Sequence, residues 1–450
     1  MSGSLELPPG VLGEIANFIF GYQRYQEHSL ALAGAISIYS GFIGKAFNAP
    51  GGAGLNTYTL FLAPTGAGKA IVKEARGRLF AEVRKSVPLV EDFKGPGELG
   101  SAAGGIRWLE KRPCCLSVFG EFGPMLKKIT SPRANANDEG VQRFILDAYS
   151  ESGAGSSIDP IAYSDRDKNS ATIYGASYSI FAESVPERIY ESLNEGLIAS
   201  GLLPRFDVWE SNGPRKYINR NRVTTPPVGL VNKLADIAAH CLAEAEYNKV
   251  TVPTYGPGAE ERLFEFEAWT TDRINASDEI ARQLWNRAFL KALKLASIRA
   301  IGINHIAPVI TLADVDWAGN LVAAQTLNLL SKFATGDVGN VEGDENKQLK
   351  EVRRVVGDYI HSEYAKNDKY GGSFEMHRDK VITEAHIQRR LITLKAFKPK
   401  PKQAIKDTLK ALLDADELRE VPKAQMQMNY GCSPRAFVAT NPACFPKSPV

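Results

Sequence analysis

A lysine behind a glycine-rich turn is the part of this sequence whose residue types and spacing most clearly indicate a chemical role. Residues 64–70 read PTGAGKA. The glycines allow backbone N–H groups to turn inward around phosphate oxygens, and an ammonium group beside them can reach the outer phosphates. We therefore expect this loop to hold the phosphates of ATP. The expected contacts are Pro64, Thr65, Gly66, Ala67, Gly68, Lys69 and Ala70.

The residue after the lysine departs from the usual phosphate-loop pattern. That pattern has Ser or Thr at this position because its hydroxyl holds Mg²⁺, whereas this sequence has Ala70. ATP is therefore the expected cofactor, with weaker support for Mg²⁺. An ordinary turn between a strand and a helix is the alternative interpretation of the loop.

A carboxylate after a second apolar run is the expected catalytic group. Residues 114–119 read CCLSVF and are followed by Gly120 and Glu121. In P-loop ATPases, an Asp after such a strand orients Mg²⁺ and a following Glu polarises the attacking water. Glu121 fits the second role, but Gly120 occupies the Asp position. Both metal-ordering side chains are thus missing, which predicts weakened hydrolysis or other metal ligands. A surface carboxylate is the alternative for Glu121.

Two further polar residues are expected to act on the nucleotide. Ser184 follows an apolar run at 178–182, where a polar side chain can sense the γ-phosphate or place the water. Arg205 lies in a short turn at 201–206. From there we expect it to reach the nucleotide of a neighbouring subunit and offset charge in the transition state. Stacking on Trp209 or local pairing is the alternative for Arg205.

A charged hairpin tip provides the expected nucleic-acid contacts. Two strand-like arms at 158–163 and 171–181 flank a charged segment at 164–170. In ring-shaped motors such a hairpin projects into the pore, where Arg166 and Lys168 would contact DNA phosphates. A solvated hairpin tip is the alternative interpretation.

The apolar pattern predicts the elements that position these residues. Residues 57–62 and 114–119 read as buried strands, and helical spacing begins at 71 and continues to about 87. Residues 131–139 read as a polar, mobile segment, and a short helix follows at 141–149.

Composition divides the chain into four expected parts. They are a helical N-terminal collar at 1–56, a P-loop ATPase core at 57–227, a helical bundle at 228–334 and a small winged-helix-like domain at 347–440. The expected fold class is therefore α/β with a P-loop NTPase core of AAA-plus or RecA-like type, whose strand order stays open. In the bundle, Lys291 and Lys294 are expected on a solvated face rather than at the nucleotide.

The last part is expected to contain helices closed by a two-stranded ribbon. The helices span 349–364, 381–391 and 401–415, and the ribbon joins 418–421 to 435–439. Its basic stretches, Arg389 with Arg390 and residues 395–402, would face a nucleic-acid backbone. Protein docking is the alternative.

Composition limits the protein class. The 450 residues carry a net charge of +3, with 23% charged and 44% hydrophobic residues, as in ordinary globular proteins. The five cysteines have no metal-ligand spacing, so no metal site is expected from them, and their odd number without a disulfide framework is typical of a reducing cytosol. We see no leader and no apolar run that could span a bilayer. A cytoplasmic protein of a bacterial or phage-infected cell, without membrane contact, is expected.

The order of several motifs resembles a known family. The segments are LPPGVLGEIANFI, FLAPTGAGKA, VFGEFGPML, SIFAESVPERIYESL, GLLPRF, AFLKALKLASIRA and ITLADVDWAGNLV, within about residues 7–330. Together they resemble the P-loop domain of unassigned name found in primase–helicase proteins of phages, plasmids and integrated mobile elements. The chain departs from that family at Ala70 and Gly120.

The resemblance implies an ATP-driven ring that unwinds DNA. It implies that Lys69 binds phosphates and that Glu121 is the catalytic carboxylate. It further implies that Ser184 is the sensor and that Arg205 acts in trans. Because the departures affect the metal positions, they bear on ATP hydrolysis more than on ATP binding.

Three functions are compatible with these observations. The leading hypothesis is an ATP-binding, ring-shaped helicase-type motor, with a hexamer favoured, that acts on single-stranded DNA in the replication of a phage or mobile element. A primase or a replication-initiation protein would be its partner. The second is a hydrolysis-deficient P-loop protein that serves as a DNA-binding or regulatory scaffold. A metabolite kinase is disfavoured, because no lid or acceptor-site motif follows the loop.

Overall fold

The computed structural model describes residues 7–131, 134–161, 169–190, 200–211, 213, 216–334, 344–398, 400–440 and 445. The chain divides into two compact units, Met1–Gly339 and Asn340–Val450, and each is described by itself. The collar, ATPase core and helical bundle that the sequence suggests all fall within the first unit. The winged-helix-like segment falls within the second.

A four-stranded parallel sheet forms the centre of the first unit. Its strands are β1 (Tyr58–Leu62), β2 (Cys114–Phe119), β5 (Ser177–Ser184) and β6 (Phe206–Glu210), in the order β2-β5-β1-β6. Neighbouring strands are parallel throughout. At the outer edge of β2, Lys94 forms one further parallel bridge with Leu116. The prediction of an α/β protein is therefore confirmed.

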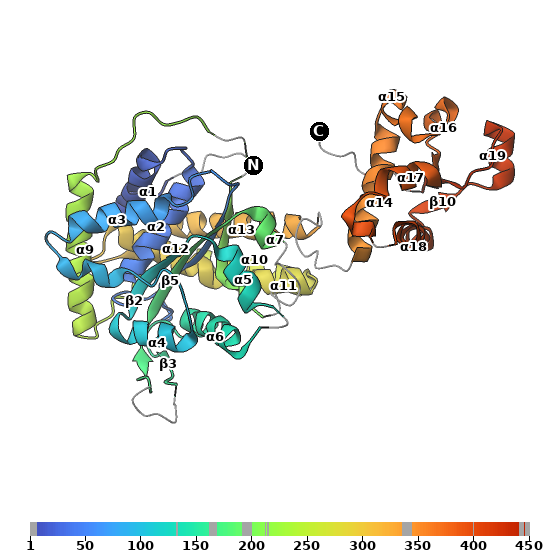
Figure 1. The fold of residues 1–450 in the computed structure, drawn as a ribbon. Coiled ribbons are helices and arrows are strands. Elements are labelled where there is room, and N and C mark those ends of the chain that lie inside the picture. Colours follow the sequence, from blue (N-terminus) through green and yellow to red (C-terminus); the bar gives the residue numbers. More distant parts are fainter. Residues whose placement is uncertain are drawn as a thin grey trace. The chain divides into compact units, whose positions relative to one another are not determined.

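Helices cover both faces of this sheet (Figure 1). One face carries α2 (His28–Ile43) and α3 (Ile71–Val83), with α1 (Gly10–Tyr22) and α9 (Val228–Glu246) packed on them. The other face carries α4 (Ala102–Lys111), α5 (Phe122–Ile129), α6 (Ala136–Ser150) and α7 (Pro186–Tyr190). Alternate strand residues serve the two cores: Phe61 and Phe181 belong to the first, Leu60 and Leu62 to the second. Burial on both faces explains why the strands read as continuous apolar runs.

Small residues allow α2 to lie close to the sheet. A Cβ atom on Gly41 would lie 2.7 Å from Cβ of Leu116, so a larger residue there must push the helix away. Within the same contact, Ser37 Oγ donates a hydrogen bond of 2.8 Å to Thr59 Oγ1. The small, apolar segment before the first strand is thus the inner helix of the first core.

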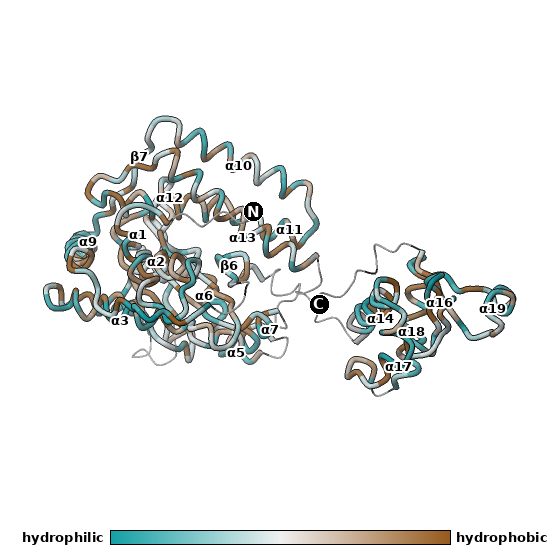
Figure 2. The backbone as a smooth tube through the Cα atoms, turned by 90° about the horizontal axis from the view of Figure 1, so that it is seen from above, coloured by the Kyte–Doolittle hydropathy of each residue, from teal (hydrophilic) through white to brown (hydrophobic). Residues whose placement is uncertain are grey.

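Further elements complete the first unit. Within the residues that the structure describes, its other helices are α10 (Ala259–Ala276), α11 (Glu279–Trp285), α12 (Ala288–Ile303) and α13 (Leu312–Ala334), and the short 3-10 helices are η1 (Pro88–Phe93) and η3 (Leu203–Arg205). Figure 2 shows alternating hydrophilic and hydrophobic stretches along α10. Strand β7 (Thr254–Tyr255) runs parallel to β8 (Val309–Ile310). Strand β3 (Ser157–Ile158) runs antiparallel to β4 (Ile173–Tyr174). This last pair forms the base of the predicted hairpin, with shorter arms than the sequence suggests.

The second unit combines helices with a small antiparallel sheet. Its helices are α14 (Asp344–His361), α15 (Tyr364–Asn367), α16 (Phe374–Arg378), α17 (Glu384–Leu391), α18 (Pro401–Asp414) and α19 (Lys423–Tyr430), with η4 (Asp368–Tyr370) and η5 (Lys395–Phe397). Strands β9 (Ile382–Thr383), β10 (Leu418–Glu420) and β11 (Ala436–Ala439) pair in the order β10-β11-β9. The predicted ribbon is β10 with β11, and β9 is an additional third strand. No helix in the described part of either unit has the length and apolar character of a membrane span.

The start of α6 differs from the sequence prediction. Residues 131–139 are predicted as a mobile segment, but α6 already begins at Ala136. The side chain of Asn135 caps this helix by accepting a 3.0 Å hydrogen bond from the amide of Asp138. Such a cap, followed by acidic residues in the first turn, is a helix-start signal that the polar composition hides.

The start of α17, by contrast, is later than predicted. Residues 381–391 are predicted as one helix, whereas Ile382 and Thr383 form β9. Thr383 is the N-cap of α17, since its hydroxyl accepts a hydrogen bond from the amide of His386 at 3.2 Å. The helix after the glycine-rich loop likewise ends at Val83 rather than near residue 87.

Candidate functional site

The 64–70 loop lies at the carboxyl end of β1, next to the corresponding end of β5. The chain leaves β1 for α3 on one face of the sheet and leaves β5 for α7 on the opposite face. Neighbouring strands whose connections diverge in this way open a crevice at their carboxyl ends, which is where ligands of open parallel sheets bind. The sequence therefore folds its glycine-rich turn into the place where this sheet would take a ligand.

The backbone of the loop presents unused hydrogen-bond donors. Gly66 and Gly68 have φ angles of +80° and +78°, a left-handed conformation that glycine adopts without strain. The Ala67 amide donates to the Pro64 carbonyl at 3.2 Å, which closes the turn. Among the described residues, none accepts a hydrogen bond from the amides of Gly66, Gly68, Lys69 and Ala70. Free amides in a tight turn before a helix form the kind of concave site that holds anions.

Lys69 folds back over this loop. Its ammonium group donates a 2.6 Å hydrogen bond to the carbonyl of Ala63. Burial lowers the pKa of Lys69, and the nearby carboxylates of Glu183, Glu121 and Glu187 oppose that shift. The lysine is thus held beside the loop, with acidic side chains around it.

A pocket of about 120 Å³ opens on one side of the loop. Its walls combine loop residues such as Pro64 and Ala67 with apolar and aromatic side chains from the segment before and along α2 and from β1, including Tyr25, Leu30 and Phe61. Ser211 lines the same pocket at the end of β6 and donates to Glu27 Oε2 at 3.1 Å. Such an apolar and aromatic wall beside the 64–70 loop is suited to a flat nucleoside base.

Glu121 and Ser184 lie at the same end of the sheet as the loop. Glu121 is exposed at the end of β2 and forms a 2.6 Å ion pair with Arg188 of α7. Ser184 ends β5 opposite Leu62 of β1 and is 5% exposed. A Cβ atom on Gly123 would lie 2.9 Å from Ser184 Oγ, so α5 begins directly against this serine. The structure thus brings Lys69, Glu121 and Ser184 to one edge of the sheet.

Glu183 is a buried carboxyl at this edge that the sequence analysis does not identify. It is 3% exposed, and its Oε1 atom has no hydrogen-bond partner in the described structure. Burial raises its pKa to about 8, against the opposing effect of Lys69 and Lys73. Its register opposite Phe61 places it on the α3 face of the sheet. The available signal was a charged residue inside an apolar run, which is rare without a functional or pairing reason.

The residues present do not fit an ordered Mg²⁺ at the usual positions. Ala70 and Gly120 offer no side-chain oxygen, and the described residues contain no group of three or more His, Cys, Asp or Glu side chains that could hold a metal ion. The first glycine of the usual phosphate-loop pattern is also replaced, by Ala63.

Arg205 lies at the opposite end of the sheet from the loop. It precedes β6, whose carboxyl end lies beside that of β1. Its guanidinium donates to the carbonyl of Gly201 at 2.6 Å and to Ser150 Oγ at 2.9 Å, and it lies 5.8 Å from the ring centroid of Tyr149. The local pairing weighed above is thus present, with partners other than Trp209. At about 3.3 Å per residue, the length of the strand separates Arg205 from the loop of its own chain.

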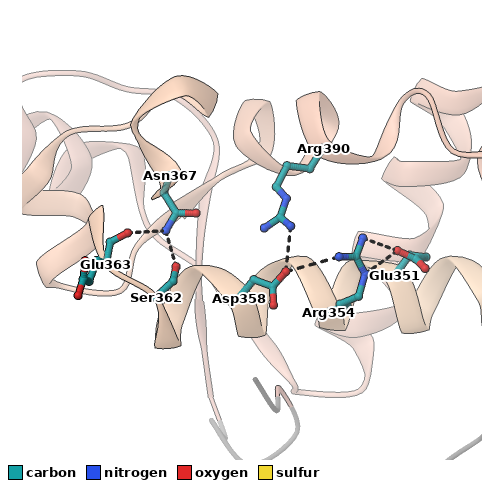
Figure 3. A network of polar contacts seen from close by, with 7 residues as sticks. All are labelled: Glu351, Arg354, Asp358, Ser362, Glu363, Asn367 and Arg390. Atoms are coloured by element: carbon teal, nitrogen blue, oxygen red, sulfur yellow. Dashed lines mark hydrogen bonds and ion pairs between the residues drawn. The ribbon is translucent and has the colours of Figure 1, made fainter. Parts of the chain in front are cut away.

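The expected nucleic-acid contacts are only partly visible. Arg166 and Lys168 lie outside the described residues. In the second unit, Arg390 forms a 2.9 Å ion pair with Asp358, which also accepts from Arg354 (Figure 3). Arg389 donates to the Tyr370 carbonyl at 2.9 Å but stays exposed. Arg390 therefore serves the internal structure of the second unit, whereas Arg389 lies at its surface.

Exposed lysines remain along α18 and just before it. Their side chains lie at the surface, and no ion pair identified within the described ranges involves them; they are Lys398, Lys400, Lys402, Lys406 and Lys410. Three of them recur every four residues on α18, so they share one side of the helix. This side of α18 can therefore face a polyanion.

The two lysines of α12 contradict the expectation of a solvated face. Lys294 is 3% exposed and donates to Oδ1 of Asn56 at 2.7 Å. Lys291 lies 3.5 Å from a carboxylate oxygen of Asp207. The buried carboxylate and amide are far away in sequence, which is why the pattern of α12 alone gives the wrong environment.

The chain matches no protein-family model, and its comparison with curated proteins gives no significant match. The resemblance to the primase–helicase family therefore rests on the motifs alone.

Proposed function

We propose that the 64–70 loop binds the phosphates of ATP and that the chain is a ring-forming, helicase-type motor acting on single-stranded DNA. The observation that carries the nucleotide site is the set of free amides of Gly66, Gly68, Lys69 and Ala70, with the Lys69 side chain, at the crevice between β1 and β5. The adjacent pocket lined by Tyr25 and Phe61 would receive the base. The motor assignment has its support in the motif resemblance.

The residues of the loop would act on ATP in a simple way. Lys69 would release the Ala63 carbonyl and donate hydrogen bonds to the outer phosphate oxygens. The free amides of the loop would bind the oxygens that bridge the phosphates. Glu121 would act as base for the attacking water only after it leaves Arg188, because the ion pair holds its carboxylate. Ser184 stands at the strand end between them.

The position of Arg205 supports the proposed assembly. Its place at the amino end of β6 makes it a candidate only for the nucleotide of a neighbouring copy, as in a ring, for which a hexamer is the favoured state. Single-stranded DNA would pass along basic surfaces such as the lysines of α18. A primase or replication-initiation protein of a phage or mobile element would be the functional partner.

A second candidate function has a specific observation in its favour. A hydrolysis-deficient P-loop protein, serving as a DNA-binding or regulatory scaffold, would explain why Ala70 and Gly120 both lack metal-ordering side chains. It would also explain why Glu121 is paired with Arg188. In this case ATP binding would drive assembly without turnover.

Steady-state ATP hydrolysis with and without single-stranded DNA distinguishes the two. The motor predicts turnover that DNA stimulates, together with rings in micrographs that contain an ATP analogue and DNA. The scaffold predicts assembly with no turnover under either condition. Unwinding that persists without ATP binding would contradict both.

A further inference from the structure

A second polar pocket lies at the amino ends of β1 and β6, the edge of the sheet opposite the loop. Its volume is about 240 Å³. Three segments far apart in sequence line it: the glycine-rich turn at 51–54, the end of α6 with the residues that follow it, and the start of α12. None of the residues assigned above to nucleotide binding belongs to this pocket.

Positive charge at this pocket exceeds negative charge. Arg287 and Lys294 line it, and Arg205 contacts its wall through Ser150. Burial lowers the pKa of Lys294 to about 7, and the cations of Arg287 and Arg205 contribute to that shift, although the carboxylate of Asp207 opposes it. Cations that lower one another's pKa values repel each other. A bound anion would offset this repulsion and stabilise their charged forms.

Arg287 is the most available of these cations. It is half-buried, and among the described residues no carboxylate lies within ion-pairing distance of its guanidinium and no acceptor takes a hydrogen bond from it. Lys291, by contrast, pairs with Asp207 at 3.5 Å, and Lys294 donates to Asn56. A planar guanidinium without an internal partner is suited to bidentate recognition of an oxyanion.

The pocket is also lined by an uncharged polar side chain and by a glycine-rich turn. Ser152 lines the pocket and is 5% exposed. Its hydroxyl has no hydrogen-bond partner in the described structure. Gly51 and Gly52 on another wall have φ angles of +85° and +88°, so this turn has the tight left-handed bends that bring backbone close to a ligand. The Ser152 hydroxyl is therefore available to donate a hydrogen bond to a bound group.

We propose that this pocket is a second anion site, which binds a phosphoryl group through Arg287, Lys294 and Ser152. At about 240 Å³ it is smaller than the ~300–1,000 Å³ pockets that take drug-sized ligands, so one or two phosphoryl groups fit it better than a whole nucleotide. The phosphoryl group can come from free phosphate or pyrophosphate, or from a nucleotide on a neighbouring copy. Only binding of a nucleotide from a neighbouring copy rests on the proposed function.

The first arm of the test measures pyrophosphate binding by the full-length Lys69→Ala chain, at constant ionic strength and at a concentration where the chain is monomeric. In this background the 64–70 loop has lost its lysine. Adding Arg287→Gln should weaken calorimetric binding about tenfold or more, and Arg287→Lys should retain most of it. The matched control is Arg282→Gln, because Arg282 is exposed on the preceding helix and pairs with Glu279. It should leave binding unchanged.

The second arm measures assembly of the chain with an ATP analogue by sedimentation, with Lys69 intact. Arg287→Gln should weaken assembly, and Arg282→Gln should not, if the phosphoryl group belongs to a neighbour. An effect in the first arm alone assigns the site to a free anion. If Arg287→Gln changes neither pyrophosphate binding nor assembly, the second site is overturned. A chain that fails to bind ATP overturns the proposed function instead, and the first arm is unaffected by that failure.

Discussion

The carboxyl of Glu183 carries the clearest pH signal at the candidate nucleotide site. Its pKa of about 8 in the folded protein lies above the ordinary value of 4.5, because the group is buried at the end of β5. The folded chain therefore binds a proton that the unfolded chain releases between these pH values. This proton binding stabilises the folded chain. Its contribution to the free energy of unfolding is fully present below about pH 4.5 and is lost as the pH rises through about 8.

Replacing Glu183 with Gln should remove this pH dependence. Between about pH 6 and pH 9, the free energy of unfolding of the original chain should fall relative to Glu183→Gln by on the order of 2 kcal/mol. Denaturant unfolding at both pH values measures the difference. Glu187→Gln is the control, since Glu187 is exposed near the same lysine. Equal pH dependence in the original chain and Glu183→Gln would show that this carboxyl titrates normally.

Ala70 and Gly120 should determine how strongly ATP binding and hydrolysis depend on Mg²⁺. Because neither offers an oxygen, the original chain should bind ATP with similar affinity in Mg²⁺ and in EDTA. The double substitution Ala70→Thr with Gly120→Asp should make ATP binding depend on Mg²⁺ and raise hydrolysis about tenfold or more. Equilibrium binding and steady-state hydrolysis check both effects. Strongly Mg²⁺-dependent binding by the original chain would mean that other residues hold the ion.

At the scale of elements, the contact between α2 and the sheet depends on a missing side chain. Gly41→Ala places a Cβ atom 2.7 Å from that of Leu116, so it should lower the free energy of unfolding by about 1–3 kcal/mol. Gly77→Ala is the control, because no atom lies within 4 Å of its added Cβ in the middle of α3. There the substitution should stabilise by about 0.5–1 kcal/mol. Thermal or denaturant unfolding compares the two; equal effects would contradict the packing.

The lysines along α18 should bind nucleic acid through its phosphates. Changing Lys402, Lys406 and Lys410 together to Gln should weaken binding of single-stranded DNA. It should also flatten the salt dependence, by roughly 0.7 in the logarithmic slope for each contact that is lost. A control variant changes three exposed lysines of other elements, Lys366, Lys369 and Lys380. Fluorescence anisotropy at several salt concentrations gives both slopes; an unchanged slope in the α18 variant removes this helix from the interface.

The sequence predicts the elements whose environment is local and misses those whose environment comes from distant partners. Strands β1, β2 and β5 appear as apolar runs because both of their faces are covered. Strand β6 is hidden by Asp207, a charged residue that is buried only because Lys291 reaches it from α12. A different long-range contact buries Lys294 against Asn56, which explains the wrong prediction of a solvated face. For the candidate site, loop spacing identifies Lys69, whereas Glu183 emerges only once the strands are in register.

At the scale of the whole molecule, two ends of one sheet carry complementary features. The end at Lys69 offers free amides to an anion, and the end at Arg205 and Arg287 has an excess of cations. Because the length of the strands separates these ends within a chain, they can act on one nucleotide only when two copies meet. Assembly and nucleotide binding should therefore be coupled.

The central claim is that ATP binds at the 64–70 loop through Lys69. Titration of ATP with the purified full-length chain, beside Lys69→Ala and the control Lys85→Ala, tests it most directly. Lys85 is an exposed lysine that pairs with Glu82 after α3. The original chain and Lys85→Ala should bind ATP equally, and Lys69→Ala should lose affinity about tenfold or more. Equal ATP affinity in all three chains, or no binding by the original chain, would contradict the account.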